Sequence, residues 1–139
     1  MSEQLIVPML SYEDGCRAMD WLVATFGFAE QTRWTDEAGR LTHGELTLGD
    51  QVIMLASPED YRSPNTQQAL GPNMAPWLNH PWIYNGLLLR VDSLDDALSK
   101  AKAHGAVLLS PVEDGFPGRR ARVADLEGQR WFLIERLVY

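Results

Sequence analysis

The chain has 139 residues, which is enough for one domain with its own hydrophobic core and small for two. Its formal net charge of −7 argues against a nucleic-acid-binding surface, which normally needs a basic patch, and is compatible with a cationic ligand. Cys16 is the only cysteine, so the chain forms no internal disulfide and no thiolate metal cluster.

The beginning of the chain, MSEQLIVPMLSYEDG, predicts a strand and then a helix. The apolar run at 5–10 reads as the strand, Asp14 is the expected N-cap of the helix, and Gly27 is its expected stop. The same beginning lacks the basic start of a signal peptide and reaches acidic residues early, so we expect a cytoplasmic protein. Apolar residues recur at helical spacing through the helix, namely Ala18, Met19, Leu22, Val23 and Phe26.

The second half of the chain repeats the order of the first. An apolar run at 86–91 precedes a helix that Ser93 caps, with Asp96 at the capping-box position, and that Gly105 closes. Asp14 and Ser93 are 79 residues apart, and the two helix-ending glycines are 78 apart. Side-chain identity between the halves is low, so chance similarity of two units stays open at this point. Strands are predicted after the two helices at 28–35, 41–48 and 51–56, and at 106–111, 119–126 and 130–137.

A long connection, 58–84, joins the halves. It is rich in Pro and Asn, which makes it a poor membrane helix, and connections of this length inside a compact domain are usually functional or mobile. A short helix is expected around 66–70. The pattern predicts a single domain, 1–139, with module one at about 4–57 and module two at about 85–137.

Four segments carry a resemblance to a known family: YEDGCRAMDWLVATFGF, HGELTLGDQVIML, VDSLDDALSKAKAHGA and GRRARVADLEGQRWFLIE. Together they resemble the vicinal oxygen chelate superfamily, which includes glyoxalase I, extradiol dioxygenases, fosfomycin-resistance enzymes and bleomycin-resistance binding proteins. The last segment is similar to an Arg…Asp-Leu-Glu-Gly-His-x-Trp ending, although Gln129 replaces the usual His. The resemblance covers nearly the whole chain and specifies the fold better than the activity.

The resemblance implies an α+β fold of two βαβββ modules that form paired, incompletely closed barrels. Each module curls four strands around a cavity, and its helix packs on the outer face. A homodimer is also implied, and pairing of the modules within one chain or by exchange between two chains both stay open.

The superfamily's metal-binding positions decide the expectation about metal. In its metal-dependent members the first and last strands of each module supply the ligands, which the resemblance places at Val7, Met54, Gly86 and Phe132. None of these suits a hard or borderline divalent cation, because a thioether is at best a soft ligand and the others offer no lone pair. Among their sequence neighbours only Asn85 has a side-chain oxygen. We therefore predict that the chain binds no metal and needs no cofactor.

The predicted strand at 41–48 carries the most suggestive polar pair, because alternate strand residues share a face. His43 and Glu45 are either a solvent-exposed polar face or part of a cavity wall, where they hydrogen-bond a ligand or each other. An acid/base role would need a substrate proton within reach and a tuned pKa, which the sequence does not supply. Alternation predicts Leu46 and Leu48 toward the helix, and Leu41, His43, Glu45 and Thr47 toward the cavity.

Aromatic and basic residues complete the candidate site. Trp131 and Phe132 are adjacent in a strand and must face opposite sides, so we expect Trp131 in the core and Phe132 in the cavity. Arg122 either neutralises an anionic ligand or belongs to a salt-bridged surface strand with its neighbours. The predicted ligand-binding residues are His43, Glu45, Met54, Trp34, Phe132, Trp82 and Arg122.

Two functions follow as hypotheses. The first is a metal-free binding protein of the bleomycin-resistance type that holds a small organic molecule, cationic in character, in a role in resistance or sequestration. The second is an enzyme, a metal-free or divergent lyase or isomerase of the glyoxalase type that uses His43 or Glu45 as acid or base. The first is favoured, because the positions that support catalysis in this fold hold groups that cannot bind the metal. The identity of the ligand cannot be read from the sequence.

Overall fold

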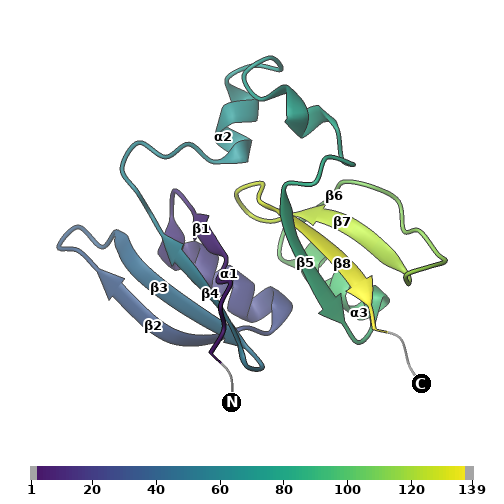
Figure 1. The fold of residues 1–139 in the computed structure, drawn as a ribbon. Helices are drawn as coiled ribbons and strands as arrows, with labels where there is room; N and C mark the ends of the chain where they lie inside the picture. Colours follow the sequence, from purple (N-terminus) through teal and green to yellow (C-terminus); the bar gives the residue numbers. More distant parts are fainter. Residues whose placement is uncertain (1–2, 137–139) are drawn as a thin grey trace. The chain divides into compact units, whose positions relative to one another are not determined.

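The computed structural model describes residues 3–136 and divides the chain into two compact units, 1–63 and 64–139 (Figure 1). Each unit holds one four-stranded sheet and one longer helix. The elements in chain order are β1 (Met9–Ser11), α1 (Gly15–Phe26), β2 (Ala29–Thr35), β3 (Leu41–Leu48), β4 (Gln51–Ala56), α2 (Pro64–Ala69), the 3-10 helix η1 (Pro76–Asn79), β5 (Gly86–Val91), α3 (Leu94–Ala103), β6 (Val107–Leu108), β7 (Arg120–Ala124) and β8 (Arg130–Glu135).

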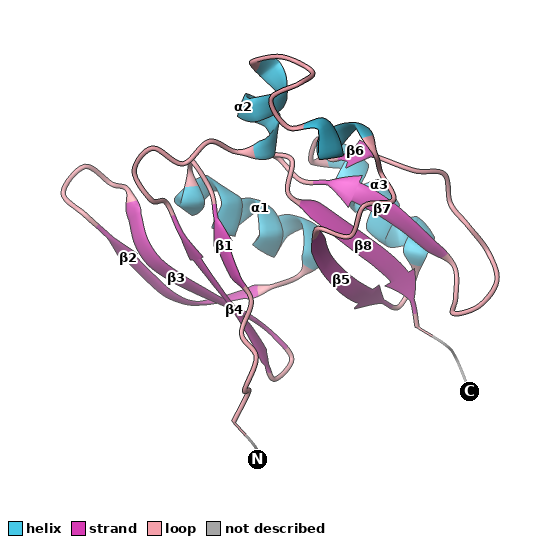
Figure 2. Cartoon of the chain, turned by 45° about the horizontal axis from the view of Figure 1, so that its top comes forward, coloured by secondary structure: helices cyan, strands magenta, loops and turns pink. Residues whose placement is uncertain are grey.

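The module-one sheet has the strand order β1-β4-β3-β2, with β1 parallel to β4 and the other pairs antiparallel. Helix α1 covers one face of this sheet (Figures 1 and 2). Leu46, Ile53 and Leu55 on that face are buried, as are Met19 and Leu22 of the helix. Burial of these apolar side chains is the main force that holds helix and sheet together.

Helix α1 begins and ends where its sequence predicts. The side chain of Asp14 accepts a hydrogen bond from the backbone N–H of Arg17, which satisfies one of the free donors at the helix start. Gly27 ends the helix with a φ of 79°, a left-handed conformation that glycine adopts without strain. Val23, predicted on the apolar face, is instead exposed, because the buried stripe runs through Ala18 and Leu22 and turns away from it.

The module-two sheet repeats this topology with the strand order β5-β8-β7-β6, and β5 is parallel to β8. Helix α3 packs on one of its faces, where Val123, Trp131 and Leu133 are buried. Ser93 caps α3 by accepting from the N–H of Asp96, as predicted. The predicted fold class, α+β with two βαβββ modules whose sheets do not close into complete barrels, is confirmed.

The Asp-Leu-Glu-Gly sequence forms the tight turn between β7 and β8. Asp125 is buried, and its Oδ1 accepts hydrogen bonds from the backbone N–H groups of Glu127 and Gln129, both at 3.0 Å. Its Oδ2 accepts from the indole N–H of Trp131 at 3.1 Å. The carboxylate therefore links the turn to the core, which gives this sequence a structural role that is independent of any metal.

Three expectations need correction. The strand expected at 5–10 covers only Met9–Ser11, because Pro8 has no N–H to continue the ladder toward β4. The strand expected at 106–111 covers only Val107–Leu108, and Pro111 follows closely. Leu41, expected to share a face with His43, is buried against the start of α1 near Gly15.

The physical reason for the Leu41 correction is a β-bulge. Trp34 pairs with His43 and Thr35 pairs with Leu41, so β3 has one more residue than β2 at this place. An extra residue breaks the strict alternation of sides, and Leu41 turns to the helix while His43 stays on the opposite face.

Within residues 3–136 no helix is long and apolar enough to cross a membrane.

Candidate functional site

The face of the module-one sheet that α1 leaves uncovered brings together four of the predicted ligand-binding residues. Strand register places Trp34 beside His43, and Glu45 beside Met54. Paired residues in neighbouring strands project to the same side of a sheet. Met9 of β1 pairs with Met54 and lies on the same side. We call Trp34, His43, Glu45, Met54 and Met9 the module-one face.

His43 and Glu45 are in direct contact on this face. The Nε2 atom of His43 and the Oε2 atom of Glu45 are 2.6 Å apart, which is a short hydrogen bond between half-buried groups. With Glu45 ionised the carboxylate can only accept, so the shared proton belongs to Nε2 of His43. The other ring nitrogen, Nδ1, has no hydrogen-bond partner within the described part of the chain.

The indole of Trp34 lies next to the imidazole of His43. The ring centroids are 5.3 Å apart and the planes are tilted by 42°. Trp34 remains 63% exposed, so most of the indole surface is available in the isolated chain. An exposed indole on the same sheet face as a carboxylate is suited to a planar or cationic group, because the face of the ring carries partial negative charge.

Phe132 lies at the centre of the face of the module-two sheet that is opposite α3. The guanidinium of Arg122, on the neighbouring strand β7, lies 4.9 Å from the centre of its ring. The ring of Tyr84 meets Phe132 edge-on at 5.3 Å. Arg122 also forms an ion pair with Glu113 at 3.7 Å. Of the two interpretations left open for Arg122, the structure shows the salt bridge, together with a cation–π contact on Phe132.

Arg130 is the residue of this face that the sequence interpretation missed. It is buried on β8, and its guanidinium donates to the backbone carbonyls of Trp77, Leu78, His80 and Ile83 at 2.8 to 3.4 Å. Burial, together with the charge of Arg122, lowers the pKa of Arg130. The bonds fix the connection between α2 and β5 to the sheet, and the guanidinium also stacks on the ring of Trp77 at 4.8 Å.

Trp82, another predicted ligand-binding residue, lies in this connection and not on either sheet face. Its ring contacts that of His80 at 4.9 Å, and its side chain is exposed. The structure therefore brings Trp34, His43, Glu45 and Met54 together on the module-one face. It brings Phe132 and Arg122 together on a face of the module-two sheet.

Two further residues of these faces could have been found from the sequence. Met9 follows Val7 by two positions, and strand alternation puts both on one side. Tyr84 is an aromatic residue directly before the predicted strand at 86–91. Arg130 could not have been found in this way, because its partners are backbone carbonyls of a loop whose conformation the sequence does not predict.

The positions to which the resemblance assigns the superfamily's metal ligands, Val7, Met54, Gly86 and Phe132, hold side chains that do not suit a divalent metal ion. Met54 offers only a thioether, and Phe132 offers only a ring that packs on Tyr84 and Arg122. Gly86 has no side chain, and a Cβ built there would overlap the carbonyl oxygen of Arg130. Within residues 3–136 no group of three or more His, Cys, Asp and Glu side chains is arranged to hold a metal ion.

Two open sheets of mixed topology, each with a helix on one face and aromatic and polar groups on the other, define a protein built from two βαβββ modules. The family comparison agrees, since the model of the Glyoxalase/Bleomycin resistance protein/Dioxygenase superfamily matches residues 6–133. The chain belongs to this superfamily. No curated protein matches the chain in sequence.

Three solved structures illustrate the proteins that share this fold. TioX from Micromonospora sp. ML1 is 28% identical, with a TM-score of 0.65 and 98% of each chain covered. The fosfomycin resistance protein FosX from Listeria monocytogenes, in complex with Mn(II) and sulfate, is 15% identical, with a TM-score of 0.68 and coverage of 99% of this chain and 94% of FosX. TnmS3, an antibiotic binding protein from Streptomyces sp. CB03234, is 20% identical, with a TM-score of 0.61 and coverage of 97% and 100%.

Proposed function

We propose that the chain is a metal-independent binding protein that holds a small, planar, cationic organic molecule against the module-one face. The observation that carries this proposal is the cluster of Trp34, His43 and Glu45, in which an exposed indole contacts an imidazole that is hydrogen-bonded to a carboxylate. A flat cation can stack on the indole while the carboxylate compensates its charge. The physiological role would be resistance to a toxic compound or its sequestration.

Several observations support binding without a metal. FosX was crystallised with Mn(II), whereas the positions of this chain that the superfamily resemblance assigns to metal ligands hold a thioether, a phenyl ring and a glycine, with Val7 as the fourth. TnmS3 is described as an antibiotic binding protein, which shows that the fold accommodates such a function. The polar groups on the module-one face are few and lie among apolar ones, which is the usual composition of a small-molecule site.

The proposed face can be tested with a matched pair of probes, 9-aminoacridine, a cation at neutral pH, and the neutral acridine. Quenching of tryptophan fluorescence gives the affinity of the full-length protein for each. We expect tighter binding of 9-aminoacridine, a loss of about tenfold in Trp34→Ala, and a loss of about threefold in Glu45→Gln. The control Phe116→Ala removes an exposed aromatic residue outside both faces and should change nothing. Equal affinity of wild type and Trp34→Ala would contradict the proposal.

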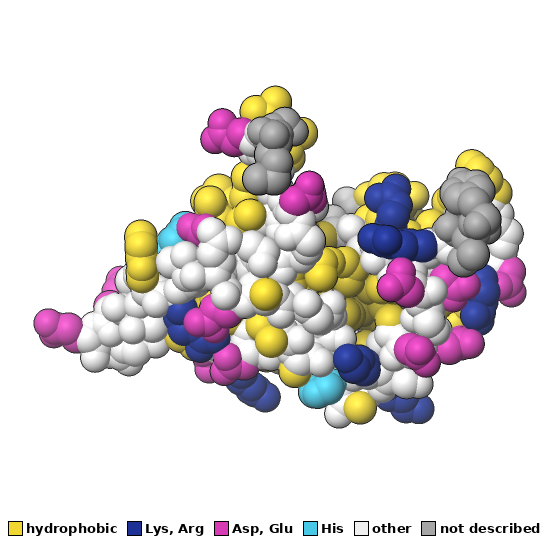
Figure 3. All heavy atoms as spheres, turned by 90° about the horizontal axis from the view of Figure 1, so that it is seen from below, with side chains coloured by type: hydrophobic (Ala, Val, Ile, Leu, Met, Phe, Trp, Pro, Cys, Tyr) yellow, Lys and Arg dark blue, Asp and Glu magenta, His cyan; other side chains and the backbone are white. Residues whose placement is uncertain are grey.

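We also propose that the chain is a single functional domain and that it forms a homodimer in the cytoplasm. Leu5, Ile6 and Met9 are 79% to 90% exposed, and such apolar side chains commonly become buried when a second copy binds. Hydrophobic side chains also reach the surface in the view of Figure 3, among charged ones. Sedimentation velocity should give a dimer for the wild type and a weaker dimer for Ile6→Glu; a monomer at all concentrations would contradict this part.

The contact between His43 and Glu45 also favours a second candidate function. When a carboxylate accepts a hydrogen bond from Nε2 of an imidazole, the lone pair of Nδ1 can accept a proton from a substrate. Many enzymes orient a general-base histidine in this way. In this case the chain would be a metal-free lyase or isomerase. Turnover of an α-keto aldehyde hemithioacetal that is lost in His43→Ala and kept in Thr47→Ala would support catalysis, and turnover unchanged in His43→Ala would exclude this base.

A further inference from the structure

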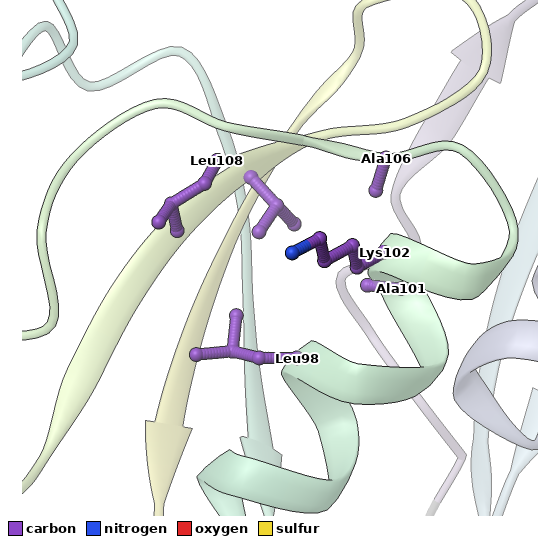
Figure 4. A pocket seen from close by; sticks show the side chains of 6 residues that line it. Leu98, Ala101, Lys102, Ala106 and Leu108 are labelled. Carbon is purple, nitrogen blue, oxygen red and sulfur yellow. The ribbon is translucent and has the colours of Figure 1, made fainter.

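A pocket lies in module two on the opposite side of its sheet from Phe132, between α3 and strands β6 and β7 (Figure 4). Its volume is about 220 Å³, and it is lined by Leu98, Ala101, Lys102, Ala106, Leu108 and Val123. Apart from Lys102 these side chains are apolar. Ala101 and Val123 are buried, whereas Leu108 and Lys102 are exposed, so the pocket lies between helix and sheet and is open to solvent. It belongs to neither of the faces described above.

Comparison of the two modules explains why this space is empty. Gly27 and Gly105 end the two helices, and each is followed by the residue that starts toward the next strand, Phe28 in module one and Ala106 in module two. Phe28 is buried in module one. At the equivalent place the methyl group of Ala106 fills far less volume than a phenyl ring. Module two therefore lacks the large buried aromatic side chain that module one has at this position.

Lys102 gives the pocket its chemistry. Figure 4 shows its side chain extending from α3 across the pocket, with the ammonium nitrogen in the space between Leu98 and Leu108. Within the described residues the ammonium group forms no ion pair or hydrogen bond. A single unpaired cation over an apolar cavity complements a ligand that has an apolar body and one negative charge.

The geometry points to a binding site for a small apolar carboxylate, with the hydrocarbon part between α3 and β7 and the carboxylate paired with Lys102. The volume limits the size of the ligand, because an apolar cavity of roughly 150 Å³ is known to take up benzene. The larger space of about 220 Å³ suits one aromatic ring with a short acidic arm. The matching probe is phenylacetate, and its neutral counterpart of the same shape is phenylacetamide.

Titration of the full-length, 15N-labelled protein with each probe, followed by amide NMR shifts, tests the site. With phenylacetate we expect shifts centred on Leu98, Ala106 and Val123, and about fivefold weaker binding of phenylacetamide. Lys102→Gln should weaken phenylacetate binding by the same factor. Lys100→Gln, two positions before Lys102 on the same helix and not part of the pocket lining, should leave it unchanged, and serves as the matched control.

Ala106→Phe restores in module two the side chain that module one has at this place. It should abolish binding of phenylacetate and leave the melting temperature equal or higher, because the new ring fills the cavity. Equal affinity for the two probes, or an unchanged affinity in Lys102→Gln, would show that the lysine stem merely covers apolar surface. Shifts confined to β3 and to Phe132 would place the probe on the sheet faces and overturn the site.

Discussion

Replacement of Asp125 by alanine should lower the free energy of unfolding more than the replacement of a nearby surface residue. The carboxylate accepts three hydrogen bonds, two from backbone N–H groups of the turn and one from the indole of Trp131. Trp131 is 1% exposed, so its N–H cannot turn to water when the acceptor is removed. Asp125→Ala therefore removes the acceptor of this buried N–H, together with the acceptor of two backbone N–H groups in the turn.

The expected loss in free energy of unfolding is about 3–5 kcal/mol, because a buried unsatisfied donor costs about 1–3 kcal/mol and bonds to a charged acceptor contribute similar amounts. This is a large fraction of the stability of an ordinary domain, which is about 5–15 kcal/mol. Asp125→Asn keeps one oxygen acceptor but places an amide N–H₂ against other donors. We expect it to fall between the wild type and Asp125→Ala.

Urea unfolding followed by circular dichroism measures these differences. The matched control is Asp114→Ala, which removes an exposed carboxylate paired with Arg119 and should change the stability by less than about 0.5 kcal/mol. A loss below about 1 kcal/mol in Asp125→Ala, or one equal to that of the control, would refute the proposed role of the carboxylate in the turn.

Three further predictions concern other residues. Arg130→Met should lower the free energy of unfolding by about 2–4 kcal/mol and speed amide hydrogen exchange in the connection between α2 and β5. Unchanged exchange in this connection would contradict the role of Arg130. Gly86→Ala should cost about 1–3 kcal/mol in unfolding free energy, because its Cβ overlaps a backbone oxygen of β8; a neutral effect would speak against the close approach. Arg33→Gln should cost about 1 kcal/mol or less. The hydrogen bond to Asp20 raises the pKa of Arg33, so the stabilisation is complete below the ordinary pKa and is lost only as the pH rises through the raised one. Urea unfolding should therefore give the same loss in unfolding free energy for Arg33→Gln at about pH 6 and about pH 9. A loss that differs between the two pH values would contradict a raised pKa of Arg33.

The order of the elements could be predicted because local signals agreed with one another. Asp14, Gly27 and Ser93 mark helix ends through side-chain and backbone chemistry that acts within a few residues. Strands β3, β4 and β5 have the bounds that their apolar runs predict. These features depend on neighbours in sequence, which is why they are readable without a structure.

The composition of the candidate site could be predicted only in part. Alternation correctly placed Phe132 opposite Trp131, and it grouped His43 with Glu45. It failed at Leu41, because a bulge depends on how β2 and β3 pair. Contacts between segments far apart in sequence, such as Arg130 with the carbonyls near His80, depend on a loop conformation that no local pattern determines.

The central claim, binding of a planar cation without a metal, is tested most directly by calorimetric titration of chelator-treated protein with 9-aminoacridine. The claim predicts the same affinity before and after the chelator, no change on addition of Ni²⁺ or Zn²⁺, and a loss of about tenfold in Trp34→Ala. Binding that appears only after a metal is added, or that is indifferent to both Trp34→Ala and Glu45→Gln, would contradict it.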